Sequence, residues 1–344
     1  MCIRDRLKDK SFNQGTFEGV KLYAANNGLS YKYYQPANGD QATDDDRYDA
    51  MKAAVDGGAK VIVCAGFMQE GALRMAAKEF PNVSFVFVDG YPITEEAGVD
   101  GSPVLKNVAG IAFKEEQCGY LAGYAVVKEG YTKLGFTGGG GGDNPACCRY
   151  GYGFVQGAND AAVELGIAAD VSCEYVYGGK FSGDADITAY MDNWYATKGV
   201  EVVFACGGGI YTSAAEAAAK VGGKLIGVDS DQSPIINQYA DGMTVTSAMK
   251  GLAATVKTLL TDTVAGNFDL HAGKVENLGL VSGDDLTLNY VGLPVETTEW
   301  NDTFTVDDYT ALVKAMVDGK VTVSSDITAR PETTIAVNYN GNIK

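Results

Sequence analysis

Two aspartates stand directly after hydrophobic runs that are typical of buried strands. Asp89 ends the run Ser84–Asp89 (SFVFVD), and Asp229 ends the run Lys224–Asp229 (KLIGVD). In open parallel sheets, ligands bind beyond the carboxyl ends of the strands. A carboxylate there accepts hydrogen bonds from hydroxyl or N–H groups, and such bonds are stronger than those to a neutral acceptor. We therefore expect ligand acceptors at both positions, with a turn or cap aspartate as the structural alternative.

Two aromatic residues and one amide have the chemistry to recognise a flat ligand. Phe12 and Asn13 stand where a helix is expected to begin, and Phe181 lies among polar residues after a predicted strand. An aromatic ring stacked on a base contributes ~1–3 kcal/mol in nucleic-acid systems. The amide offers both donors and an acceptor. The alternatives are core positions for the two phenylalanines and a helix N-cap for Asn13.

Glycines mark further strand ends. Gly207 and Gly208 follow the run Val202–Cys206, and glycine allows a backbone to approach a ligand closely. Gly138–Gly142 is a run of five glycines, but it lacks the Lys-Ser/Thr pair that completes a phosphate-binding loop. We interpret this run as a turn from a strand to a helix.

One lysine completes the set of candidates. Lys250 follows the alternating segment Thr244–Met249 and would pair with Asp229, or would lie on the surface. Asp231 is expected to cap the next helix, and Phe67 is a secondary candidate for the wall of a cleft.

The elements that must position these residues alternate along the chain. The predicted strands are Lys60–Ala65, Ser84–Asp89, Val108–Phe113, Lys133–Thr137, Val171–Val176, Val202–Cys206, Lys224–Asp229 and Thr244–Met249. The predicted helices are Gln14–Asn26, Asp45–Gly57, Gln69–Glu79, Gln117–Glu129, Gly151–Leu165, Ile187–Thr197 and Thr212–Val221. Strand, helix and strand in this rhythm predict an α/β fold with parallel sheets and right-handed crossovers.

The C-terminal part is patterned differently. His271–Lys274 and Leu286–Val295 are predicted to be extended, and Val306–Met316 to be a helix. Ser324–Lys344 is polar and is expected to pack as a strap or to stay mobile.

Composition narrows the class of partner. The chain has 344 residues, which suits two domains, and its net charge is −17. Such a charge repels phosphate backbones and anionic lipid surfaces, so we expect neither nucleic acid nor a membrane surface as a ligand. The seven cysteines are expected to be buried small hydrophobes, with a vicinal Cys147–Cys148 disulfide as a rarer alternative. With His271 as the only histidine, we expect no metal site and no cofactor.

Four motifs carry a family resemblance. They are DKSFNQ at Asp9–Gln14, FKEE at Phe113–Glu116 followed by GYLAG at Gly119–Gly123, GGG at Gly207–Gly209 and GVDSDQ at Gly227–Gln232. Their types, order and spacing resemble the basic membrane protein family, the PnrA-like nucleoside-binding lipoproteins of bacterial ABC importers. The resemblance covers roughly residues 9–265 and is loose in the C-terminal third.

The resemblance implies the type I periplasmic-binding-protein fold, with two Rossmann-like lobes joined by a multi-strand hinge and closing on a ligand. We expect an N-terminal lobe of residues 1–112 plus 250–281 and a C-terminal lobe of 113–249 plus 282–344. Family members begin with a signal peptide, a lipidated cysteine and a first strand. Here only Met1–Lys8 precede the first motif and Cys2 lacks a lipobox, so we expect a truncated chain without that strand.

The resemblance also implies a function. The protein would be an extracytoplasmic lipoprotein or periplasmic solute-binding protein of an ABC importer, not an enzyme, and a monomer that docks on the permease. Its ligand would be a purine nucleoside held between the lobes. The ligand-binding positions carried over from the family are Phe12, Asn13, Asp89, Phe181, Gly207, Gly208, Asp229 and Lys250. Phe12 and Phe181 would sandwich the base, Asp89 would bind its edge, and Asp229 with Lys250 would bind the ribose diol.

Three alternatives remain open. The same fold could bind a modified nucleoside, a free base or a sugar, for uptake or for sensing. It could serve as a signalling module, although no helix-turn-helix precedes it. An enzyme is disfavoured, because no G-x-G-x-x-G follows a first strand and His271 lies in a weakly patterned region.

Overall fold

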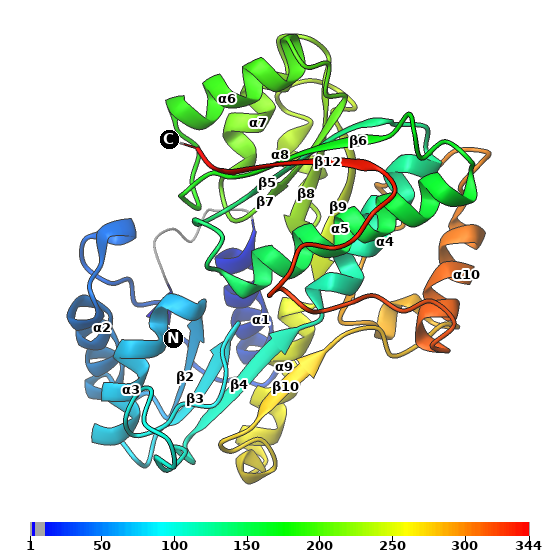
Figure 1. Ribbon diagram of the computed structural model, residues 1–344. Coiled ribbons are helices and arrows are strands. Elements are labelled where there is room, and N and C mark those ends of the chain that lie inside the picture. Colours follow the sequence, from blue (N-terminus) through cyan, green and yellow to red (C-terminus); the bar gives the residue numbers. More distant parts are fainter. Residues whose placement is uncertain (1, 4–10, 344) are drawn as a thin grey trace. The chain divides into compact units, whose positions relative to one another are not determined.

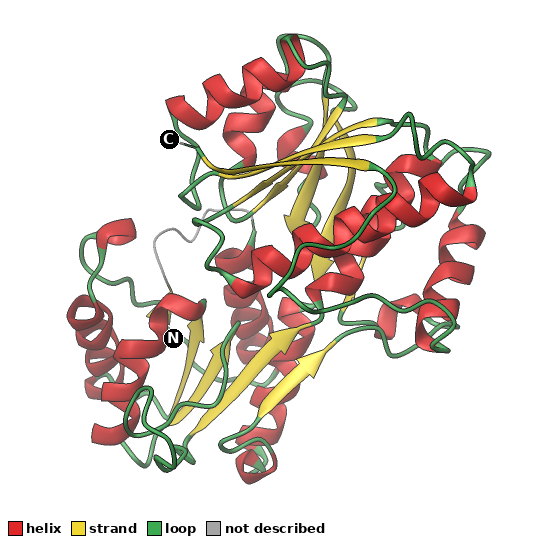
Figure 2. Ribbon diagram, viewed as in Figure 1, coloured by secondary structure: helices red, strands yellow, loops and turns green. Residues whose placement is uncertain are grey.

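The computed structural model describes residues 2–3 and 11–343 and consists of two compact units (Figure 1). Unit 1 comprises Met1–Phe113 and Leu252–Leu278, and unit 2 comprises Lys114–Gly251 and Gly279–Lys344. The chain passes from one unit to the other at three places, each at or next to the end of a strand. Both units are α/β, with helices packed against a twisted sheet (Figure 2).

Unit 1 is built on a parallel sheet of order β1-β2-β3-β4-β10. Its strands are β1 (Cys2–Ile3), β2 (Val61–Ala65), β3 (Ser84–Val88), β4 (Val108–Phe113) and β10 (Val275–Leu278). The helices are α1 (Phe12–Asn26), α2 (Asp44–Asp56), α3 (Glu70–Glu79) and α9 (Leu252–Val264). Because side chains alternate along a strand, Ile62, Cys64, Phe85 and Phe87 share one face, and they form a buried core with α2 and α3.

Capping determines where α2 begins, and a close glycine contact determines how α1 packs on α9. Thr43 and Asp46 form a reciprocal capping box at the start of α2, which satisfies two otherwise orphaned backbone donors. Helices α1 and α9 come very close, since a Cβ on Gly19 would lie 2.8 Å from the Cα of Ala253.

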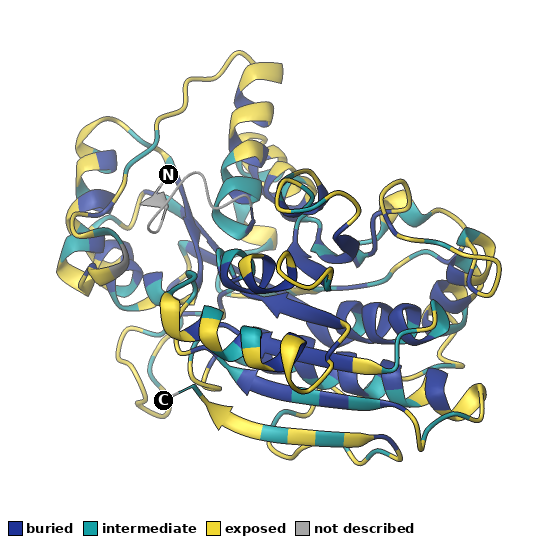
Figure 3. Ribbon diagram, turned by 90° about the horizontal axis from the view of Figure 1, so that it is seen from above, coloured by how far each residue is buried: buried dark blue, intermediate teal, exposed yellow. Residues whose placement is uncertain are grey.

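Unit 2 is built on a seven-stranded sheet of order β11-β9-β8-β7-β5-β6-β12, parallel except for the β11–β9 pair. Its strands are β5 (Lys133–Gly138), β6 (Ser172–Tyr177), β7 (Val202–Cys206), β8 (Lys224–Asp229), β9 (Thr244–Lys250), β11 (Val291–Gly292) and β12 (Ala336–Asn342). Its helices are α4 (Glu115–Lys128), α5 (Pro145–Glu164), α6 (Ala185–Ala196), α7 (Tyr211–Ala218), α8 (Ser233–Ile236) and α10 (Val306–Val317). The central strands are buried, while β12 at the sheet edge is largely exposed (Figure 3).

Helices α4 and α5 pack backbone against backbone through two small-residue rows. A Cβ on Gly123 would lie 2.0 Å from the carbonyl oxygen of Phe154, and a Cβ on Gly157 would lie 2.0 Å from that of Tyr120. Gly119 and Gly153 are equally tight against the facing helix. This close packing, which only glycine permits, fixes the first turn of α4 beside the first turns of α5.

The predicted strands match observed strands to within one residue at each end. The glycine run is the predicted turn, and α5 after it begins at Pro145, before the predicted Gly151, because the side chain of Asn144 caps the N–H of Cys147 at 2.9 Å. The α/β class is confirmed.

In the C-terminal third, the helix predicted at Val306–Met316 is confirmed as α10, but the two predicted extended segments were largely wrong. Helix α9 was not predicted, and His271–Lys274 is a turn that precedes β10 instead of an extended segment. Within Leu286–Val295, only Val291–Gly292 is a strand. The polar C-terminal segment is held on α5 by two hydrogen bonds, because the side-chain amide of Gln156 donates to the backbone carbonyl of Ser324 and accepts from its N–H. The chain then adds β12 to the sheet.

Six cysteines, at positions 64, 118, 147, 148, 173 and 206, are buried and free, so the expectation of small hydrophobes is confirmed for them and no vicinal disulfide forms. The side chain of Cys2, and the motif residues Asp9 and Lys10, lie outside the described residues. Within the described ranges, none of the helices is both long and apolar enough to cross a bilayer.

Candidate functional site

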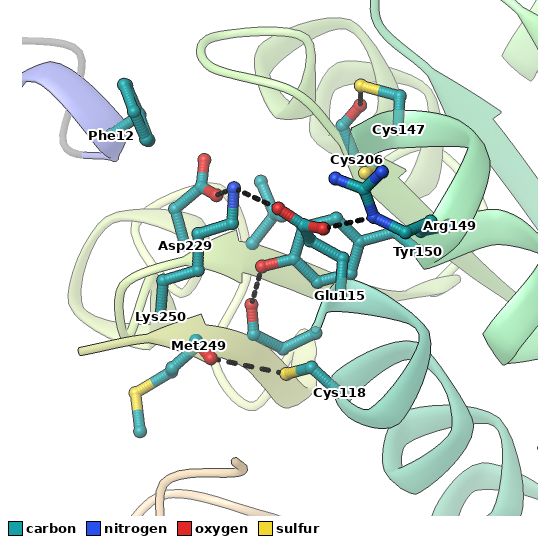
Figure 4. A network of polar contacts seen from close by, with 12 residues as sticks. Phe12, Glu115, Cys118, Cys147, Arg149, Tyr150, Cys206, Asp229, Met249 and Lys250 are labelled. Carbon is teal, nitrogen blue, oxygen red and sulfur yellow. Dashed lines mark hydrogen bonds and ion pairs between the residues drawn. The ribbon is translucent and has the colours of Figure 1, made fainter. Parts of the chain in front are cut away.

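A buried cluster of alternating charge lies at the carboxyl end of the sheet in unit 2. The Lys250 ammonium is 3.0 Å from Glu115 Oε1 and 3.8 Å from Asp229 Oδ1. On its far side, Glu115 accepts a hydrogen bond from Arg149 Nε at 2.6 Å. Figure 4 shows the resulting sequence of cation, anion, cation and anion from Arg149 to Asp229.

The charges of this cluster are shielded from solvent. Lys250 and Glu115 side chains are each 1% exposed, and Asp229 is 8% exposed. Burying an ion costs free energy unless it is paired with an opposite charge. In this cluster, each charge has an opposite charge beside it. Glu116 flanks the cluster at 3.9 Å from Arg149 Nε, and burial raises the pKa of its carboxyl. The Lys250 Nζ also lies 5.4 Å from the centre of the Tyr150 ring.

The turn after β8 aims the Asp229 carboxylate. Asp229 has φ +65°, a left-handed conformation that costs free energy for residues other than glycine and is found at functional sites. The buried Gln232 stabilises the turn, because its Oε1 accepts the N–H of Val228 at 2.9 Å and its own N–H donates to Ser247 Oγ at 3.1 Å.

Asp231 serves this turn in a different way from that predicted. Its carboxylate accepts the N–H of Ser233 at 3.0 Å and the hydroxyl of Thr297 at 2.9 Å. The N-cap of α8 is Gln232, so Asp231 bonds the first turn from one position upstream.

Phe181 rests on the glycine turns of the same unit. A Cβ on Gly139 would lie 2.5 Å from the ring, and one on Gly207 would lie 3.2 Å from it. A Cβ on Gly208 would lie 2.7 Å from the Phe181 carbonyl oxygen, which accepts the N–H of Gly209 at 2.8 Å. A side chain at position 139 would therefore displace the ring. The ring is half-buried, so one part of it stays exposed.

Unit 1 carries the remaining candidates at the carboxyl end of its own sheet. Asp89 follows β3 with φ +56°, the same conformation as Asp229. Phe12 is the first residue of α1, and its ring lies near Gly66 after β2, at 3.8 Å from a built Cβ. Asn13 is inside the helix, because the N-cap is Ser11. Phe67 is 37% exposed, which excludes a core role.

The structure thus brings Asp229 and Lys250 together, as expected, and Phe181 together with Gly207 and Gly208. It also shows two residues that sequence reasoning missed as site residues, Glu115 and Arg149. The signal for Glu115 was available, since it stands two residues after the buried run Val108–Phe113, in a motif already noted. Arg149, the one charged residue between Pro145 and Ala158 in α5, was not predicted.

Comparison with known proteins agrees with this architecture. The family pattern described as "ABC transporter substrate-binding protein PnrA-like" matches residues 1–312. The chain is 30% identical over 340 residues to the ABC transporter nucleoside-binding protein BmpA of Lactococcus lactis subsp. cremoris, covering 93% of this chain and 86% of that protein. It is 27% identical over 290 residues to basic membrane protein B of Borreliella afzelii, covering 82% and 78%.

Solved structures share the fold. An ABC transporter solute-binding protein from Conexibacter woesei superposes with a TM-score of 0.68 at 20% identity, covering 94% of this chain and 97% of that one. A second such protein, from Aeropyrum pernix, has a TM-score of 0.66 at 20% identity, covering 93% and 85%. The predicted type I periplasmic-binding-protein fold is confirmed. The chain belongs to the PnrA-like family of ABC transporter substrate-binding proteins.

Proposed function

We propose that this protein binds a purine nucleoside and delivers it to the permease of an ABC importer. The observation that carries the proposal is that a carboxylate–ammonium pair on β8 and β9 and an aromatic ring seated on glycine turns lie at the carboxyl end of one sheet in unit 2. A carboxylate and an ammonium suit a neutral diol, which both accepts and donates hydrogen bonds. An exposed aromatic face suits a planar base.

Each candidate has a role in this proposal. Asp229 accepts the hydroxyl protons of the ribose diol, and Lys250 donates to the hydroxyl oxygens. Phe181 stacks on the base, and Gly207 with Gly208 lets the backbone approach the ligand. From unit 1, Phe12 supplies a second aromatic face, while Asn13 and Asp89 bond the edge of the base. The left-handed backbone of Asp89 and Asp229 supports these roles, because such strain is characteristic of functional sites.

The relative named as nucleoside-binding supports the ligand class. As proteins of this family are extracytoplasmic components of importers, we propose that this chain acts outside the cytoplasm as a monomer and carries out no chemistry. Incubation with inosine, followed by chromatography, should return inosine alone; accumulation of hypoxanthine or ribose would contradict this part of the proposal.

The ligand is tested by isothermal titration calorimetry. Protein freed of co-purified ligand by unfolding and refolding should bind guanosine, inosine or adenosine, and should not bind ribose. Phe181→Ala should weaken binding by roughly 10- to 100-fold, as expected for a lost stack of ~1–3 kcal/mol. Asp229→Asn should weaken it by at least about tenfold, because a charge-assisted acceptor is lost.

Matched variants control for the fold. Asp231→Asn keeps the acceptor for Ser233 and should leave nucleoside affinity unchanged, as should Tyr239→Ala, which removes an aromatic residue that is 38% exposed. Binding of a sugar with no nucleoside binding would overturn the proposal, as would unchanged affinity in both Phe181→Ala and Asp229→Asn.

A further inference from the structure

Lys250 lies closer to Glu115 than to Asp229, the carboxylate with which it is proposed to bind the ligand. An ammonium and a carboxylate on adjacent strands would be expected to close into a direct ion pair. Instead, Lys250 Nζ stands 3.8 Å from Asp229 Oδ1, beyond hydrogen-bond distance, and 3.0 Å from Glu115 Oε1. The ammonium therefore lies closer to Glu115 than to Asp229, although it forms an ion pair with both.

We propose that Glu115 is a positioning residue that holds the Lys250 ammonium away from Asp229, so that the Asp229 carboxylate can accept the hydroxyl protons of a ligand diol. The inference rests on the proposed function. A lysine in full contact with Asp229 would compete with the ligand for the same oxygens. In a site this buried, attraction between opposite charges is strong, and the Glu115 carboxylate at 3.0 Å opposes the pull of Asp229 on the ammonium.

Glu115 is itself fixed from the other side. Arg149 Nε donates to Glu115 Oε2 at 2.6 Å, while Lys250 meets Oε1, so each carboxylate oxygen has its own cation. The glycine contacts between α4 and α5 bring these residues together, since Glu115 begins α4 and Arg149 lies in the second turn of α5. Figure 4 shows the Glu115 carboxylate between the two cations.

This arrangement makes a specific prediction about the ribose. A ligand with both hydroxyls uses the Asp229 carboxylate more fully than one that lacks the 2′-hydroxyl. The native protein should therefore prefer inosine to 2′-deoxyinosine. Without the negative charge of Glu115, Lys250 should close on Asp229, and the preference for the ribonucleoside should fall.

The test measures the dissociation constants of inosine and 2′-deoxyinosine by calorimetry. The native protein should prefer inosine by about tenfold or more, the worth of one charge-assisted hydrogen bond. In Glu115→Gln, which keeps the shape and the acceptor for Arg149, the preference should fall to within about threefold. Glu296→Gln, which removes an exposed glutamate of unit 2, should keep the native preference.

A double-mutant cycle separates positioning from a general structural role. If Glu115 acts through Lys250, then Glu115→Gln should change the inosine preference little in a Lys250→Met background, where no ammonium remains to move. An equal change in both backgrounds would overturn the inference, as would a native preference retained in Glu115→Gln.

Circular dichroism shows whether each variant is folded. If Glu115→Gln alone does not fold, the double variant Glu115→Gln, Lys250→Met is measured instead. In that case its preference should match that of Lys250→Met alone, and a different preference would overturn the inference. Failure of the native protein to bind either nucleoside overturns the proposed function and this inference with it. Binding by the native protein, with an unaltered preference in Glu115→Gln, overturns this inference alone.

Discussion

Glu129, at the end of α4, should make unit 2 less stable as the pH rises. Both of its carboxyl oxygens are buried, and among the described residues neither has a hydrogen-bond partner. Burial, reinforced by the nearby charge of Glu299, raises the pKa of Glu129 from 4.5 to about 9. Its place at a helix C-terminus also disfavours a negative charge.

The sign and size of the effect follow from linkage. Because the folded-state pKa lies above the unfolded value, the contribution to stability is complete below about pH 4.5 and is lost as the pH rises toward about 9. At pH 7 the unfolded chain is about 2.5 pH units past its own pKa, and each unit corresponds to about 1.36 kcal/mol. Keeping Glu129 protonated in the folded state at pH 7 therefore costs on the order of 3 kcal/mol.

Glu129→Gln removes this cost, because the amide has no proton to lose. Relative to the native protein, its stability should rise by about 3 kcal/mol between pH 4 and pH 7. For a unit of this size, that difference corresponds to a gain in the unfolding midpoint on the order of 5 to 10 °C. Scanning calorimetry at several pH values measures it for the transition of unit 2.

An exposed glutamate provides the control. Glu296→Gln removes an exposed carboxylate from the same unit and should leave the difference between variant and native midpoints small. The reasoning is refuted if the Glu129→Gln protein tracks the native protein with a constant offset from pH 4 to pH 8, because the carboxyl would then titrate alike in the folded and unfolded states.

Two further predictions concern packing and a histidine. Gly157→Ala should destabilise unit 2 by on the order of 3 kcal/mol in denaturant unfolding, because its Cβ would lie 2.0 Å from a backbone oxygen. Gly141→Ala, where the nearest atom is 3.6 Å away, should cost little, and equal losses in the two variants would contradict the packing argument. Burial lowers the pKa of His271, but its hydrogen bonds to Glu276 and Asp262, both at 2.8 Å, outweigh burial and raise it. Below pH 6.5, unit 1 should therefore be more stable with native His271 than with His271→Gln, by roughly 1 to 3 kcal/mol. This difference should disappear as the pH rises through the raised pKa of His271. Urea unfolding measures it, and a difference that grows with pH would contradict the raised pKa.

Local patterning explains why so many elements could be predicted. A buried parallel strand needs a short apolar run, and the runs that end at Phe113, Cys206 and Asp229 are unambiguous. The strand ends then place Asp89 and Asp229 at the carboxyl edges of their sheets. Strand β12 was not predicted, because its residues are polar. It forms because its backbone pairs with β6, which would otherwise be the edge strand of the sheet. Helix α9 was not predicted, although Gly251 separates it from β9 as glycines separate other strands from their helices.

The sequence by itself therefore determined the fold class, the strand ends and the residue types that lie at those ends. Only the tertiary structure decided that Lys250 lies closer to Glu115 than to Asp229, and that Arg149 holds Glu115 from behind. The physical reason is that long-range pairs depend on which strands are neighbours and on how closely two helices approach. In a sequence, a glutamate, lysine or arginine looks the same whether it is solvated or buried. Here, the glycine contacts between α4 and α5 place Glu115 beside Arg149, and the end of β9 adds Lys250 to the same buried cluster.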